Sequence, residues 1–155
     1  MLKFCRDAWD KNKDKLKAEI MLDEHINECE YVYLVELIVK HILNPALKEA
    51  DCCEFDFDEI TVIDNGDYQG TLLFMIPEKT YQPDANDYLL TYAYYGSCSG
   101  CDTLQRIQGF KFDGFPTESQ VNDYMLLCKG LVCNIVKPYN FGWGANELFT
   151  EIAEV

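Results

Sequence analysis

The sequence has few basic side chains and no long apolar run. It holds 13 Lys and Arg against 27 Asp and Glu, which gives a formal net charge of −14 over 155 residues. Binding to nucleic acid needs Lys and Arg that displace counterions from phosphates, so we expect no direct contact with DNA or RNA. No stretch approaches the roughly 18 apolar residues of a membrane helix, and the first residues (MLKFCRD) lack the apolar core of a secretory signal. We therefore expect no membrane association and a location in the cytoplasm.

Signatures of catalysis are also absent from the sequence. It contains no G-x-S-x-G, H-E-x-x-H, phosphate-binding glycine loop or dinucleotide-binding glycine motif. Its two histidines, His25 and His41, lie in predicted helices. A pairing of either histidine with Cys or Ser would depend on tertiary contact alone. We therefore expect a noncatalytic protein.

Apolar and aromatic residues are plentiful enough to form a core. Hydrophobic residues make up 48% of the chain, with 10 Tyr and 9 Phe, which predicts one folded domain over residues 1–155. Residues 4–24 are good helix formers with an amphipathic pattern and predict a first helix. Asn27 and Glu30 have the spacing of a capping box and predict the start of a second helix. Asn44, which precedes Pro45, predicts its end.

After residue 50 the pattern changes to that of strands. Three are predicted, at residues 60–63, 71–76 and 88–95, and the sequence DNGD at 64–67 is a strong turn signal between the first two. The second strand is apolar at odd and at even positions, so both of its faces are apolar. This predicts a central strand covered on both faces. Thr117 and Gln120 predict the capping box of a late helix that ends near Asn134. Beyond Pro138 we expect irregular chain and then a short acidic segment.

These elements predict an α+β fold. A short antiparallel β-meander of about three strands would pack with the N-terminal helices and the late helix. Residues 1–50 form the helical part, and residues 51–155 form an acidic, β-rich part that includes the late helix.

The negative charge is concentrated in the second part. Residues 1–50 hold 8 basic and 10 acidic side chains, a balance of −2, whereas residues 51–155 hold 5 and 17, a balance of −12. One segment has seven acidic residues and no basic one: Asp51, Glu54, Asp56, Asp58, Glu59, Asp64 and Asp67. Two interpretations are open. The segment is a solvated face that keeps the protein soluble, or it is a negative surface that binds a basic groove on a partner.

The cysteines are numerous for a chain of this length. There are eight, at positions 5, 29, 52, 53, 98, 101, 128 and 133. Thiols inside cells are kept reduced, so we expect metal binding, redox chemistry or burial for them and not a disulfide framework. Cys5 and Cys29 lie beside apolar neighbours in helical patterns, which favours a packing role.

Cys98 and Cys101 form a C-x-x-C motif after the third strand. Two thiolates at this spacing can bind one zinc ion, and Gly100 permits the tight turn between them. The other ligands must come from elsewhere in the chain. Cys128 on the late helix is the first choice, and the fourth ligand is open among Cys133, Cys52, Cys53, Asp67 and a histidine. The competing interpretations are a dithiol redox site and cysteines that only pack or turn.

Several segments resemble a family of small proteins from bacteriophages and prophages of Gram-positive bacteria. The resemblance covers roughly residues 55–140, and it lies in residues 66–77 (GDYQGTLLFMIP), 81–83 (YQP), 92–105 (YAYYGSCSGCDTLQ), 124–129 (YMLLCK) and 137–139 (KPY). Cys98, Cys101 and Cys128 match the family's recurring cysteines, so the resemblance implies a metal role for these three. It does not fix the fourth ligand, for which we take Cys133.

Among such phage proteins, a small acidic chain with a zinc site resembles a type II-A anti-CRISPR protein. The resemblance implies a noncatalytic inhibitor that binds the host's CRISPR effector nuclease and keeps target DNA from loading. Its structural zinc would hold the end of the third strand against the late helix, and the seven acidic residues would face the partner. The alternative is a phage or prophage zinc-binding module with a housekeeping or interaction role and no defence target. The oligomeric state is open in both cases.

Overall fold

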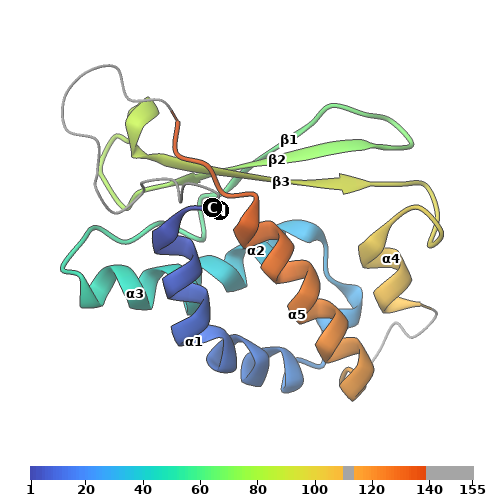
Figure 1. Ribbon diagram of the computed structural model, residues 1–155. Helices are drawn as coiled ribbons and strands as arrows, with labels where there is room; N and C mark the ends of the chain where they lie inside the picture. The colour runs from blue at the N-terminus through green and yellow to red at the C-terminus, as the bar shows by residue number, and fades with distance from the viewer. Residues whose placement is uncertain (110–113, 139–155) are drawn as a thin grey trace, which may run out of the picture.

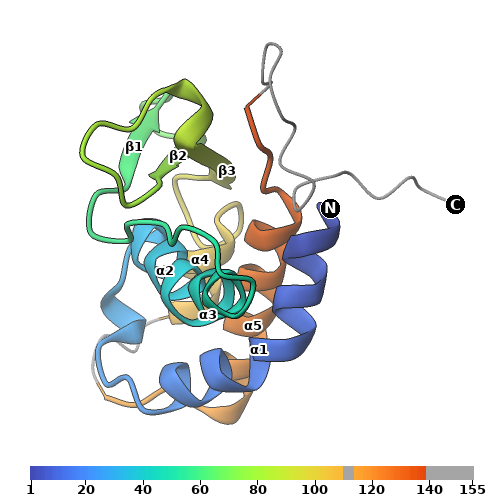
Figure 2. The same cartoon turned by 90° about the vertical axis from the view of Figure 1, so that its left-hand side faces the viewer.

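The computed structural model describes residues 1–109 and 114–138. A three-stranded antiparallel sheet in the order β1-β2-β3 lies on a layer of helices (Figures 1 and 2). The predicted α+β class and the meander are therefore confirmed. The predictions for the chain beyond Pro138 lie outside the described residues.

The first and last helices pack side by side in the helical layer (Figure 1). Helix α1 spans Lys3–Met21, and its apolar stripe of Phe4, Ala8, Leu16 and Ile20 is buried. Helix α5 spans Glu118–Cys133 and begins at the predicted capping box, where Gln120 N–H donates to Thr117 Oγ1 and Gln120 Oε1 accepts from Thr117 N–H. Both predicted helices are confirmed within a few residues.

The end predicted for the second helix was wrong. Helix α2 (Tyr31–Ile38) continues through a π-helical turn, η2 (Val39–Leu43), into α3 (Asn44–Glu49). Pro45 lies in the first turn of α3. Backbone N–H groups in a first turn have no partner within the helix, so the N–H that proline lacks costs no hydrogen bond there. The wider π turn ends with Asn44 N–H donating to Val39 O, so the chain stays helical up to the proline.

The capping role predicted for Asn27 was also wrong. Asn27 is buried within a short 3₁₀ helix, η1 (Ile26–Glu28), and the side chain of Glu30 does not cap α2 either. Tyr124 explains the difference, because its buried hydroxyl lies 2.8 Å from Asn27 Oδ1 and 3.1 Å from Ile26 O. A tertiary hydrogen bond from α5 therefore uses the side chain that the local pattern assigned to capping.

The three predicted strands are confirmed as β1 (Thr61–Asp64), β2 (Gly70–Pro77) and β3 (Tyr88–Tyr95). β2 is central, as predicted, and pairs antiparallel with both neighbours, with Leu73 opposite Ile63 and Tyr92. Its inward residues Phe74 and Ile76 are fully buried. The prediction that β2 is covered on both faces was wrong for the described residues, because the helices lie on one face of the sheet only (Figures 1 and 2).

Short elements join these units. Helix η3 (Ala85–Asp87) precedes β3, and helix α4 (Thr103–Gln108) follows it. None of the helices in the described ranges is long and apolar enough to span a membrane.

The helices and the sheet are joined by a buried side chain, Asn44. Its Nδ2 donates to Phe55 O and its Oδ1 accepts from Phe55 N–H, both at 2.9 Å. Phe55 is itself 1% exposed, and it forms an isolated bridge with Glu78 just beyond β2. One side chain at the start of α3 therefore fixes the chain that leads into the sheet.

We predict that Asn44→Ala lowers the free energy of unfolding by about 2 to 5 kcal/mol, because it removes two buried hydrogen bonds to the backbone of Phe55. Chemical denaturation followed by circular dichroism measures the change. Asn122→Ala on the exposed face of α5 is the control and should stay within about 0.5 kcal/mol of the wild type. A loss at Asn44 no larger than that of the control would contradict the assignment.

Candidate functional site: an acidic segment and a dithiol turn

The acidic segment, residues 51–67, follows one edge of the sheet. It runs from the end of α3 through β1 to the β1–β2 hairpin (Figure 1). Among the described strands β1 pairs only with β2, and all four of its residues are exposed. Five of the seven predicted partner-binding residues precede β1, and the other two, Asp64 and Asp67, lie at the hairpin end. The structure therefore spreads the seven carboxylates along an edge and does not gather them in one cluster.

The part of the acidic segment before β1 is anchored through Phe55. On either side of this buried ring, Asp56 N–H donates to Pro77 O at 2.8 Å and Lys79 N–H donates to Glu54 O at 2.9 Å. These backbone bonds hold Glu54 and Asp56 beside the end of β2. Their carboxylates are therefore presented from an ordered backbone, which reduces the entropy lost when a partner binds.

The hairpin end of the segment is also ordered. Asp64 Oδ1 accepts hydrogen bonds from Tyr95 Oη at 2.6 Å and from Gly66 N–H at 2.9 Å. These two bonds, the one from Tyr95 first, lower the pKa of Asp64, so it is ionised at neutral pH. Asn65 Oδ1 accepts from Thr71 N–H at 2.8 Å and ties the loop that carries Asp67 to β2.

The carboxylates of the acidic segment are not neutralised by the rest of the described chain. None of the seven forms an ion pair with a described Lys, Arg or His, whereas α1 pairs Lys3 with Asp7 at 2.8 Å. Two lysines approach the segment, Lys40 and Lys79, but their ammonium groups lie 5.7 and 5.6 Å from the centre of the Phe57 ring. These two ammonium groups offset part of the charge without pairing with a carboxylate, so the segment stays net negative.

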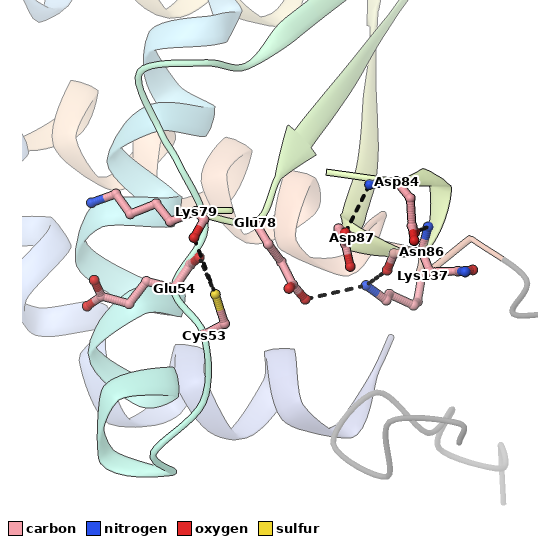
Figure 3. A network of polar contacts seen from close by, with 8 residues as sticks. All are labelled: Cys53, Glu54, Glu78, Lys79, Asp84, Asn86, Asp87 and Lys137. Carbon is pink, nitrogen blue, oxygen red and sulfur yellow. Dashed lines mark hydrogen bonds and ion pairs between the residues drawn. The ribbon is translucent and has the colours of Figure 1, made fainter. Parts of the chain in front are cut away.

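Sequence reasoning missed three acidic residues that lie around Lys137. Glu78 pairs with the ammonium group of Lys137, and the charges of Asp87 and Asp84 also act on it (Figure 3). Lys137 Nζ is 3.9 Å from Glu78 Oε1 and also donates to Asn86 O. Partial burial raises the pKa of Glu78; Asp87 and Asp84 add to this effect, and Lys137 opposes it. These residues are distant in sequence from 51–67, so a search for continuous acidic runs could not find them.

The dithiol turn, residues 96–101, joins β3 to α4 at the hairpin end of the sheet (Figure 1). The sulfur atoms of Cys98 and Cys101 are 3.1 Å apart, and both residues are exposed. Cys98 N–H donates to Cys101 Sγ at 3.3 Å. Gly96 is required by this geometry, because a Cβ there would lie 2.4 Å from Cys101 Sγ.

The buried carboxylate of Asp102 accepts hydrogen bonds from the backbone of the dithiol turn and of α4. Asp102 is 4% exposed and caps α4 by accepting from Gln105 N–H at 3.1 Å. It also accepts from Tyr31 Oη at 3.0 Å and from Gly96 N–H at 3.1 Å. Gln105 Nε2 returns a bond to Gly96 O at 3.3 Å. The backbone of the turn is therefore fixed to the core while the two thiols face outward.

The other predicted metal ligands lie elsewhere. Cys128 is fully buried in α5, and this burial raises the pKa of its thiol. Cys133 is half-buried at the end of α5, where its charge adds to the burial that raises the pKa of Cys5 to about 12. No group of three His, Cys, Asp or Glu that could hold a metal occurs within residues 1–109 and 114–138.

The structure thus brings Cys98 and Cys101 together but does not add Cys128 or Cys133 to them. The alternatives for the fourth ligand do not form a group of three ligands with Cys98 and Cys101 among the described residues either. These alternatives were Cys52, Cys53, Asp67 and a histidine. Among the described residues no third ligand lies with Cys98 and Cys101, so a zinc ion that fastens β3 to α5 is unconfirmed. Zinc binding stays a prediction.

No protein-family model matches the chain, and no curated protein or solved structure matches it. The resemblance to phage proteins therefore stays a prediction. The functional argument rests on the acidic segment and the dithiol turn.

The two thiol environments predict different reactivities. Hydrogen bonds from the side chain and then the backbone of Cys98 lower the pKa of the Cys101 thiol. Partial burial and then the charges of Glu78, Asp87 and Glu54 raise the pKa of Cys53, which is also exposed. The thiolate is the reactive form. In reduced, metal-free protein at pH 7.5 we expect iodoacetamide to alkylate Cys101 several-fold faster than Cys53, as read by peptide mass spectrometry.

The alkylation ratio should fall as the pH is raised beyond 9, because the Cys53 thiol, whose pKa is raised above its usual value, ionises only in that range. Equal rates at pH 7.5, or a faster reaction at Cys53, would contradict the pKa difference.

Proposed function

We propose that the protein is a noncatalytic inhibitor of a type II CRISPR effector nuclease and binds it through the acidic segment. The observation that carries the proposal is the absence of ion pairs to all seven carboxylates of this segment among the described residues. A surface that keeps one sign of charge steers association with a partner of the opposite sign and disfavours partners of the same sign.

The chemistry of the nuclease supports this choice of partner. Effectors of this class hold the guide and target strands in a positively charged channel. A protein with a net charge of −14 is repelled by DNA itself but attracted by an empty basic channel. Inhibition then needs no catalytic step, because an occupied channel cannot accept target DNA.

The order in the acidic segment supports the same role. Phe55 and the Asp64 hydrogen bonds hold the two ends of the segment, and the exposed strand β1 lies between them. An edge strand with free backbone groups gives a basic segment of the partner hydrogen bonds in addition to charge. Val62 and Ile63, 41% and 46% exposed, supply apolar contact along the same strand.

Charge reversal tests the proposal. The variant Glu54→Lys, Asp58→Lys, Glu59→Lys changes three residues of the segment that make no side-chain hydrogen bond within the described chain. We expect it to bind a guide-loaded type II-A effector nuclease at least about tenfold more weakly than the wild type in titration calorimetry, because like charges then face each other.

A matched variant controls for net charge. Asp10→Lys, Asp14→Lys, Glu19→Lys adds the same charge on the exposed face of α1 and should bind nearly as tightly as the wild type. If both variants bind equally weakly, the loss of affinity follows total charge and not the changed surface. That result would overturn the assignment of the segment as the binding surface. A wild-type protein that binds none of a panel of type II-A effectors would overturn the proposed function and favour a phage module with no defence target.

A further inference from the structure

The dithiol turn has the features of half a metal site. Cys98 and Cys101 hold two exposed thiols side by side, and a structural zinc ion is held by four ligands in a tetrahedron. Sulfur atoms at about 2.3 Å from zinc are about 3.8 Å apart. The present separation of 3.1 Å reaches that value by small rotations of two exposed side chains.

The chain does not supply the other half. The segments 110–113 and 139–155 contain no Cys or His, so every thiol and imidazole of the chain lies among the described residues. None of them joins Cys98 and Cys101 in a group of three within that part of the chain. In this arrangement the chain offers the pair no third Cys or His ligand, and a second molecule is one source of the missing two.

A second copy of the same turn fits this need. Residues 96–101 are Gly, Ser, Cys, Ser, Gly and Cys, which carry no formal charge in the thiol form and have small side chains. Two copies that each carry a net charge of −14 repel one another; the turn itself adds no formal charge in the thiol form, while Asp64 lies beside it through its bond to Tyr95. Small residues also let two backbones approach closely enough to share one ion.

The turn is also prepared before any metal binds. Asp102 and Gln105 fix the backbone of Gly96, and the Gly96 position leaves room for the Cys101 sulfur. A preformed pair of ligands loses little conformational entropy on binding.

We propose that one zinc ion joins two copies of this protein, with Cys98 and Cys101 of each copy as its four ligands. Each thiol that binds loses its proton to solvent, so the assembly takes up one Zn²⁺ and releases four protons. This inference does not depend on the proposed function, since it concerns only the chain and the metal.

The test is a zinc titration of the full chain, kept reduced with a phosphine. Native mass spectrometry and analytical ultracentrifugation should show a monomer without metal, and a dimer with one zinc per two chains once zinc is added. A chelator should return the monomer. Cobalt in place of zinc should give the visible spectrum of a tetrahedral site with four sulfur ligands.

Variants locate the site. Cys98→Ser with Cys101→Ser should stay monomeric with zinc and give no such cobalt spectrum, yet melt like the wild type in the metal-free state because both side chains are exposed. Cys53→Ser, which removes an exposed thiol elsewhere, should dimerise like the wild type. One zinc per monomer, zinc-dependent dimers in the double variant, or no metal uptake by the reduced protein would each overturn the proposal.

Discussion

The double hydrogen bond between Asn44 and the backbone of Phe55 is the contact on which the arrangement of helices and sheet depends. It satisfies two buried backbone groups at the point where the chain leaves the helical layer. Asp102 does the same at the other end of the sheet, where it binds the backbone at Gly96 and Gln105. Both loops are fixed by a buried polar side chain, and each carries one of the two surfaces that we consider functional. The acidic segment and the dithiol turn are thus held in place by the buried side chains of Asn44 and Asp102.

Local patterns predicted most of the fold. Strand periodicity located β1, β2 and β3, and the Thr117 capping box located α5, because each signal depends on residues a few positions apart. The failures came from contacts distant in sequence. Asn27 looked like a cap but accepts a hydrogen bond from Tyr124, about a hundred positions away, and Pro45 follows a π turn instead of ending a helix.

The candidate site shows the same division. The C-x-x-C spacing predicted that Cys98 and Cys101 meet, and they do. No local signal could tell that Cys128 faces the core, since a free cysteine packs as readily as it binds metal. The acidic run was visible in the sequence, but its division between the two ends of β1 and the grouping of Glu78, Asp84 and Asp87 around Lys137 required the sheet. Sequence therefore identified the residue types, and tertiary structure decided which of them act together.

The two surfaces complement one another physically. In our proposal two acidic chains meet at the dithiol turn, whose residues carry no formal charge in the thiol form. A zinc-linked pair would present two acidic segments in one particle, and two linked segments bind a partner with two basic regions more tightly than either alone. The acidic segment, by contrast, suits a basic partner and repels nucleic acid.

The most direct measurement is a competition between this protein and target DNA for the guide-loaded nuclease. The guide-loaded nuclease is first mixed with increasing amounts of the protein, fluorescently labelled target DNA is then added, and the anisotropy of the DNA is read. The account predicts that anisotropy falls to the value of free DNA when the protein is present first, with a midpoint near the nuclease concentration. Unchanged anisotropy at a large excess of protein would contradict the claim that the acidic segment occupies the DNA-binding channel.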